Sequence, residues 1–383
     1  MTSATATAAL FASAPASQAA RWRGQLLEFL LVGGVTLVLF PLAWCLEKYV
    51  GLDDSELAVG FLAFHAAYVI NDPHFAVTYL LFYKGAKERA FGAVFQPAQR
   101  ARYLIAGIVV PILLAAWVAA ALAMESAHAL GLLIQLMFLL VGWHYVKQGF
   151  GVLTVLSARR GVRFDPLERR VFLLHCFSGW AYAWASPFDP GRESEEKGVV
   201  YTSISHPPGL ERATQLIFFA SALALVWVLV RMRRRDGKLP PLAPLSGFLI
   251  TIWFWTVYSS ADPLLVYVIP GLHSLQYLYF VWLLKRNEAR ESEGPPSFGR
   301  PVAVRLAILA ASAAALGWLL FRGGPDFLDG TFVLTRAGAF ETGESLGATP
   351  YFAAIFAFVN IHHYFMDFVI WRRENPDTRH LAA

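Results

Sequence analysis

Ten apolar segments, separated by short charged or Gly- and Pro-rich loops, dominate this chain. A helix needs about 20 apolar residues to cross the hydrocarbon core of a bilayer. Only 15% of the residues are charged, well below the roughly 25% that is usual in soluble domains. The sequence therefore predicts an all-α integral membrane protein with about ten transmembrane helices. We expect these helices at residues 26–46, 57–83, 103–124, 129–155, 171–186, 213–230, 245–258, 264–284, 306–321 and 351–371.

The charges in the loops predict the direction of each span. Loops rich in Lys and Arg follow every second segment, whereas the loops between them carry acidic or mixed charge. Positive loops stay in the cytoplasm, so we expect both termini on the cytoplasmic side of an inner (cytoplasmic) membrane. Residues 1–22 are expected to form a disordered tail, residues 23–373 one transmembrane domain, and residues 374–383 a cytoplasmic tail.

The composition also narrows the partners. The net charge of +5 does not indicate nucleic acid, because the basic side chains collect in the loops as membrane topology requires. Cys45 and Cys176 both lie inside apolar segments, which excludes a disulfide framework and a CxxC metal motif. We therefore expect membrane lipids as partners and no nucleic acid.

Histidines lie in the middle of four predicted spans that all run from outside to inside. They are His74, His144, His273 and the adjacent pair His362 and His363. Each lies roughly 10 to 18 residues into its span, so a rise of about 1.5 Å per residue brings them within about 10 Å of one level. Ionisable groups are costly in hydrocarbon, and structural hydrogen bonds between helices explain one such histidine better than they explain four. The layer predicts a functional site inside the membrane.

Polar side chains lie about one helical turn from several of these histidines, on the same helix face. Such a partner fixes the tautomer and direction of a metal-bound imidazole. We expect this role for Asp367, Gln148, Gln276 and Asp72. Lys147 is expected to neutralise an anionic group at the site.

His65 shares a predicted span with His74, but it lies nine residues away and on the opposite face of an ideal helix. Pro73 removes a backbone hydrogen bond and is expected to kink this span. Local unwinding could turn both imidazoles toward one cavity; otherwise His74 is the ligand that depth favours. We keep His65 and His362 as reserve metal ligands.

Imidazole ligands without cysteine suit iron, zinc or copper, and several histidines with few carboxylates suit non-haem Fe(II). A metal centre at this depth would act on a lipophilic substrate that partitions into the bilayer. Two alternatives remain open. Histidines on facing spans could hold haem as axial ligands, and a relay of His, Asp and Lys side chains could couple protons or ions to transport.

The order of the histidine motifs resembles that of the polytopic β-carotene 15,15′-dioxygenase family, which includes the bacteriorhodopsin-related proteins. Asp72-Pro73-His74-Phe75 looks like its early Pro-His-Gly motif, and Trp143-His144-Tyr145 is similar to its middle His-Phe-Gly-like motif. Leu272-His273-Ser274-Leu275-Gln276-Tyr277 resembles its late Trp-His-Ser-Leu-Arg-His motif, and His362-His363 stands for a final histidine. The resemblance covers residues from about 61 to 367.

This resemblance implies an iron centre and the oxidative cleavage of a polyene. Phe75 stands in place of a glycine of the family pattern and Tyr277 in place of a histidine, so the expected substrates extend from isoprenoids and carotenoids to acyl lipids. The sequence as a whole predicts a membrane-embedded metal oxygenase with Fe(II) as its cofactor. The metal ligands that we expect are His74, His144, His273 and His363.

Overall fold

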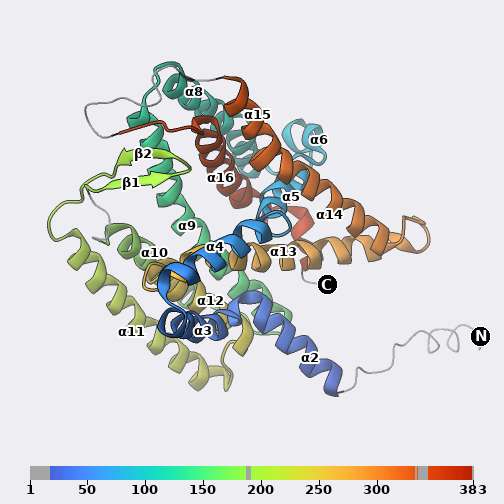
Figure 1. Ribbon diagram of the computed structural model, residues 1–383. Helices are drawn as coiled ribbons and strands as arrows, with labels where there is room; N and C mark the ends of the chain where they lie inside the picture. Colours follow the sequence, from blue (N-terminus) through green and yellow to red (C-terminus); the bar gives the residue numbers. More distant parts are fainter. Residues whose placement is uncertain (1–17, 187–190, 333, 335–343, 382–383) are drawn as a thin grey trace, which may run out of the picture.

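The chain is almost entirely helical in the computed structural model, which describes residues 18–186, 191–332, 334 and 344–381 (Figure 1). The first half contains α2 (Gln18–Phe29), η2 (Leu30–Gly34), α3 (Thr36–Tyr49), α4 (Leu52–Ala67), α5 (Asn71–Tyr83), α6 (Ala86–Phe91), α7 (Pro97–Leu104), η3 (Ile105–Val109), α8 (Val110–Ala123), α9 (Ala127–Arg159) and α10 (Pro166–Ala185). The second half contains α11 (Leu210–Asp236), α12 (Leu242–Ile252), η4 (Trp253–Val257), α13 (Pro263–Glu293), α14 (Val302–Trp318), η5 (Leu319–Gly323), α15 (Gly324–Thr331), α16 (Pro350–Ile370) and η6 (Pro376–Leu381).

Six of the described helical stretches are long and apolar enough to cross a bilayer. They are Pro97–Ala123, Ala127–Arg159, Leu210–Asp236, Pro263–Glu293, Val302–Thr331 and Pro350–Ile370. A seventh is added if Trp22–Gly34 and Thr36–Tyr49, which are bent by 57°, are counted as one span. The protein is therefore a helical, multi-pass membrane protein. The other predicted segments coincide with α10, with α4 and α5, and with the shorter apolar stretch Leu242–Val257.

The two expected tails differ from what the structure describes. Residues 1–17 lie outside the described residues, but α2 begins at Gln18 and so occupies the end of the predicted N-terminal tail. At the other end, η6 packs against the helices: the Asn287 side chain donates a hydrogen bond to the backbone oxygen of His380 (2.8 Å), and Leu381 is buried. The described part of the C-terminal tail is thus folded onto the bundle.

The second predicted span, residues 57–83, is two helices rather than one kinked helix. Helix α4 ends at Ala67 and α5 begins at Asn71, with Ile70 outside the helical region at φ −122° and ψ −63°. Pro73 lies in the first turn of α5, where its missing N–H breaks no helical hydrogen bond. Pro73 therefore helps to begin a helix here instead of bending one.

The core lies where α5, α9, α13 and α16 pack together (Figure 1). One hydrophobic cluster joins α9 to α16 through residues such as Met137 and Ile361, and another joins α5, α13 and α16 through Phe82, Val281 and Met366. Within their most apolar windows, α16 is 72% buried and α13 is 56% buried, whereas Val302–Thr331 is only 17% buried. The helices that carry the central histidines are thus the innermost ones.

A small hairpin covers one end of this core. Strands β1 (Glu193–Glu196) and β2 (Val199–Thr202) pair antiparallel, with Glu193 opposite Thr202. Tyr201 packs so closely on Gly131 of α9 that a side chain at this glycine would collide with the tyrosine. The hairpin therefore packs against the N-terminal part of α9 (Figure 1).

Candidate metal centre

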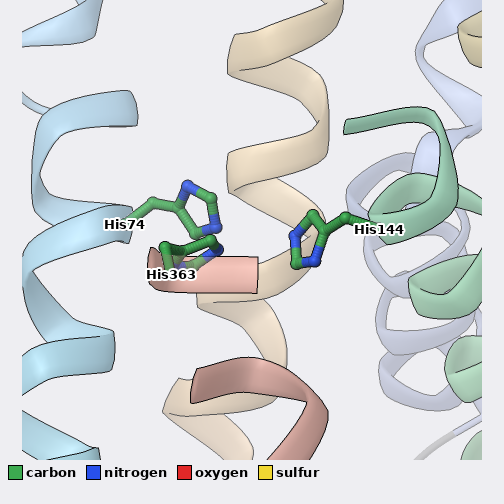
Figure 2. A group of neighbouring side chains, drawn as sticks. All are labelled: His74, His144 and His363. Atoms are coloured by element: carbon green, nitrogen blue, oxygen red, sulfur yellow. The ribbon is translucent and has the colours of Figure 1, made fainter. Parts of the chain in front are cut away.

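Four histidines from four helices meet in the core. His74 comes from α5, His144 from α9, His273 from α13 and His363 from α16, and all four are buried. The ring centroids form a closed circuit: His74 to His363 is 4.6 Å, His363 to His144 is 5.0 Å, His144 to His273 is 4.9 Å, and His273 to His74 is 5.2 Å. Figure 2 shows three of these rings, His74, His144 and His363, turned toward one another. The predicted ligand set thus converges on one place.

The nitrogen atoms of this cluster lie close to the separation that a metal ion requires. One ring nitrogen each from His74, His144 and His363 lies within 4.8 Å of the other two. The Nε2 atoms of His144 and His273 are 3.1 Å apart. An ion with metal–nitrogen bonds of about 2.0–2.1 Å holds its nitrogen ligands roughly 3–4 Å apart, so small side-chain shifts would bring the nitrogens of His74, His144 and His363 onto one ion. His273 lies beside His144, outside this group of three.

The tautomer of His74 is set by a chain of hydrogen bonds. Ser274 Oγ donates its hydrogen to Asn71 Oδ1 at 2.8 Å. Since a hydroxyl has a single hydrogen, the 3.0 Å contact between Ser274 Oγ and His74 Nδ1 must use the Nδ1–H as donor. The lone pair of His74 is then on Nε2, which is buried and has no hydrogen-bond partner among the described residues. A metal-bound histidine usually has this arrangement.

Asp367 brings a carboxylate to the edge of the cluster. Its Oδ1 accepts hydrogen bonds from the hydroxyls of Tyr277 (2.7 Å) and Thr78 (3.4 Å). Its Oδ2 lies 3.3 Å from His363 Nε2 and 3.8 Å from His144 Nε2. Asp367 therefore stands beside the imidazoles, as its position four residues after His363 predicted, and its direction is fixed by Tyr277.

Two tyrosine rings stack on the imidazoles of His273 and His144. Tyr145 stacks on His273 at a centroid distance of 4.2 Å, and Tyr364 stacks on His144 at 4.7 Å. Both tyrosines are buried. Since a stacked ring restricts rotation of its neighbour, these contacts limit the positions that the two histidines can take.

Unsatisfied polar atoms concentrate at this cluster. Among the described residues, His74 Nε2, His273 Nδ1, both ring nitrogens of His363 and Asp367 Oδ2 are buried without a hydrogen-bond partner. The ion-pair contacts of Asp367 Oδ2 with the imidazoles lack hydrogen-bond geometry. A buried polar atom without a partner costs about 1–3 kcal/mol, so several of them at one point indicate that the donor set is built for a ligand. All of these atoms are of the kind that binds a transition metal.

The two reserve ligands lie away from the cluster. His65 is on α4, and its Nδ1 contacts the backbone oxygen of Phe61 at 2.8 Å on an exposed surface. His362 faces away from its neighbour His363, with Nδ1 3.0 Å from the Tyr79 hydroxyl and Nε2 3.0 Å from the backbone oxygen of Ala106. With both nitrogens satisfied, His362 is a structural link between helices. Neither residue is placed as a metal ligand.

Lys147 and Asp72 also lie outside the cluster. The Lys147 ammonium lies over the rings of Phe150 and Phe177, at 5.5 and 6.0 Å from their centroids. Asp72 is buried in an ion pair with Arg322, 3.3 Å between Oδ2 and Nε. The helix positions of both residues predicted a place near the site, but each has its partner elsewhere.

The two glutamines hold the backbone that carries the histidines rather than the imidazole rings. Gln148 Nε2 donates to the backbone oxygen of His273 (3.2 Å) and to Gln276 Oε1 (2.8 Å). Gln276 Nε2 in turn donates to the backbone oxygen of Val32 at 2.6 Å. The pair links α9, α13 and η2. The two glutamines therefore position the helices that carry the histidines, and they do not bind the imidazole rings as expected.

Ser274, Tyr277, Thr78 and Asn71 are site residues to which the sequence argument gave no role. Ser274 and Tyr277 lie in the same short motif as His273, and Asn71 comes three residues before His74. The only indication in the sequence was that hydrogen-bonding residues lie close to these histidines. Their partners lie on other helices, however, and spacing along one helix cannot show those contacts.

Comparison of the chain with protein families, with curated proteins and with solved structures finds no match. The interpretation of the site therefore rests on its own geometry and chemistry.

Proposed function

We propose that this protein is an integral-membrane oxygenase that binds non-haem Fe(II) through His74, His144, His273 and His363 and acts on a lipophilic substrate. The observation that carries the proposal is the concentration of partnerless buried nitrogens on α5, α13 and α16 beside His144 of α9, with ring nitrogens of His74, His144 and His363 within 4.8 Å of one another. Four imidazoles with a single nearby carboxylate, and no cysteine, favour iron over the metals that prefer sulfur or oxygen ligands. Zinc and copper suit the same nitrogens, and metal analysis separates the three.

A ferrous ion bound here would supply dioxygen binding and the oxidising power for the reaction. The residues of the chain supply the surroundings. Ser274 and Asn71 keep the Nε2 lone pair of His74 directed at the centre. Tyr277 holds the Asp367 carboxylate, and the Tyr277 hydroxyl gives Asp367 a proton donor at 2.7 Å. The burial of all four histidines excludes water, which protects reactive species from side reactions.

The proposed substrates are isoprenoids such as carotenoids, or acyl lipids. The resemblance of the histidine motifs to the β-carotene dioxygenase family supports the first class. Phe75, which takes the place of a glycine in that pattern, packs against His363 at a centroid distance of 4.8 Å. An aromatic side chain so close to the centre would narrow the space for a rigid polyene, which is why acyl chains belong in the proposal.

We further propose ten spans, with both termini in the cytoplasm and the protein in the inner (cytoplasmic) membrane. The alternation of basic and acidic loops supports this topology. Fusions of alkaline phosphatase, active only outside, and of a fluorescent protein, fluorescent only inside, would test it. We expect fluorescence for a fusion after residue 381 and phosphatase activity for one within residues 191–209. The reverse pattern would contradict the proposed direction.

The enzymatic proposal is tested with purified protein reconstituted with Fe(II) in vesicles containing a carotenoid or an unsaturated lipid. We expect oxygen consumption and an oxidised product, both abolished by His144→Ala and retained by His65→Ala. A protein that holds no stoichiometric metal and keeps its activity after His144→Ala would overturn the proposal.

Haem and transport are the outcomes that this experiment must separate. A porphyrin is wider than the whole cluster, so binding haem would require the four rings to move apart. Bound haem would be detected by its Soret band. A proton relay loses support because Lys147 and Asp72 have partners away from Asp367. Proton-coupled uptake into liposomes that Asp367→Asn abolishes would nevertheless select the transporter.

A further inference from the structure

A cavity of about 360 Å³ lies between α5, α13 and α14, next to the charged residues at the ends of these helices. It is lined by Lys84, just after α5, by Lys285 and Glu288 on α13, by Arg300 in the loop before α14, and by Arg305 in the first turn of α14. The three helices pack side by side in the same hydrophobic cluster (Figure 1). The cavity shares no residue with the metal centre.

The charges in this cavity do not balance. Glu288 is contacted by Lys84 (2.7 Å), Lys285 (2.7 Å) and Arg305 (3.7 Å). One carboxylate thus serves three cations, and Arg300 adds a fourth. The Lys285 side chain is only 12% exposed and pairs with Glu288, so the excess positive charge falls on the more exposed side chains of Lys84, Arg305 and Arg300. The cavity is therefore complementary to an anion.

The rest of the wall is apolar. Leu80 of α5 and Leu306 and Leu309 of α14 line the cavity below the basic groups. Leu306 and Leu309 are three residues apart and so lie on one face of α14. Ile308, which also lines the cavity, is 46% exposed on an outer helix. Basic groups at the helix ends and an open apolar wall along the helices match a molecule with an anionic head and hydrocarbon chains.

We propose that this cavity binds an anionic phospholipid. Its phosphate lies among Lys84, Lys285, Arg300 and Arg305, and an acyl chain runs along Leu80, Leu306 and Leu309. Basic pockets between transmembrane helices on the cytoplasmic side are suited to such head groups, and the loop charges assign these helix ends to that side. The proposal is independent of the metal chemistry.

The test uses the purified full-length protein in mixed micelles. We expect phosphatidylglycerol to raise the midpoint of thermal unfolding in a saturable way, while phosphatidylethanolamine with the same chains has a much smaller effect. The double variant Lys84→Gln and Arg300→Gln should bind phosphatidylglycerol roughly 30-fold more weakly, because each lost charge weakens binding about fivefold. Glu288 keeps Lys285 and Arg305 in this variant.

The matched control is the double variant Arg163→Gln and Lys238→Gln, which removes two exposed positive charges outside the cavity. It should bind the lipid as the wild type does. Should the first double variant misfold, Arg300→Glu reverses the charge of one exposed side chain and must weaken binding more than Arg163→Glu. Equal responses to the two lipids, equal losses in test and control variants, or a full effect of inorganic phosphate alone would each overturn the proposal.

Discussion

His74 is a histidine whose role is set by two side chains that are not ligands. Asn71 takes the hydrogen of Ser274, Ser274 accepts the hydrogen of His74 Nδ1, and His74 Nε2 is left as a lone-pair donor at the cluster. A histidine free to change tautomer would present either an N–H or a lone pair. The chain thus makes this imidazole a ready ligand before any ion binds.

Ser274→Ala is therefore expected to weaken metal binding without removing a ligand. Loss of such a partner typically lowers metal affinity about 10- to 100-fold. Competition with a chelator of known affinity measures the change. Ser246→Ala is the control, because Ser246 Oγ donates its hydrogen bond within its own helix, to the backbone oxygen of Leu242. Equal affinities for the two variants would show that the Ser274 bond does not govern the site.

The sequence could predict which histidines matter but not always which way they face. His363 and Asp367 are four residues apart, and the structure brings both to the cluster. Adjacent residues differ by about 100° around a helix, so His362 had to point elsewhere once His363 pointed inward. Lys147 shows the limit: its helix position favoured the site, but its ammonium lies over the rings of Phe150 and Phe177. Phe150 is three residues away on the same helix, whereas Phe177 comes from α10 and no spacing rule reveals it.

At the scale of elements, α14 approaches α5 backbone to backbone at Gly317. A Cβ at this glycine would lie 2.6 Å from the carbonyl carbon of Asp72 and 3.0 Å from the nitrogen of Pro73. Small residues permit such close packing of helices in membranes. The contact holds the first turn of α5, and hence His74, in place.

Gly317→Ala is expected to push α14 away from α5. Overpacking of this kind costs about 1–3 kcal/mol, so the unfolding midpoint in detergent should fall and metal affinity should fall with it. Gly151→Ala is the control, since a Cβ at Gly151 meets no atom within 4 Å. A Gly317→Ala protein as stable as Gly151→Ala would refute the close contact.

The carboxylate of Asp165 caps the start of α10 and links this helix to α11. Asp165 caps this helix by accepting the N–H of Glu168 (2.9 Å), and it also pairs with Arg231 and Arg235 of α11 at 2.7 Å each. The backbone N–H of Glu168 and the Arg231 guanidinium together lower the pKa of Asp165 from its usual 3.8 to about 2. Ionised Asp165 therefore stabilises the contact between α10 and α11.

This pKa gives a pH dependence with a definite sign. A carboxyl whose pKa is lowered by folding stabilises the protein fully above its unfolded pKa, and that contribution is lost as pH falls through the folded pKa. Asp165→Asn should therefore lower the unfolding midpoint at neutral pH, and its deficit should shrink as pH falls from about 4 to about 2. Thermal unfolding of both proteins across this range checks it; a deficit that stays constant would contradict the charge-based explanation.

The helices themselves were largely predictable, but not their interruptions. Each expected apolar segment coincides with helical structure. The break between α4 and α5 escaped hydropathy because both sides of it are apolar, from Phe61 and Leu62 to Val77 and Leu80. Pro73 was recognised as disruptive, yet the chain leaves the helix before it, at residues 68–70.

At the scale of the whole molecule, the site lies where the most buried helices meet. The histidines of α9, α13 and α16 belong to the inner spans, and α5 joins them with nine buried residues. Loop charges and helix rise predicted that the histidines share one depth. Which helices lie side by side depends on packing between distant segments, and no local pattern in the sequence contains that information.

The central claim is that four histidines hold one metal ion, and the adjacent pair on α16 offers its most direct test. Metal content by mass spectrometry is measured for the wild type, His363→Ala and His362→Ala after purification without chelator. We predict stoichiometric metal, iron foremost, in the wild type and in His362→Ala, and its loss in folded His363→Ala. A wild type without metal, or equal metal in the two variants, would contradict the account.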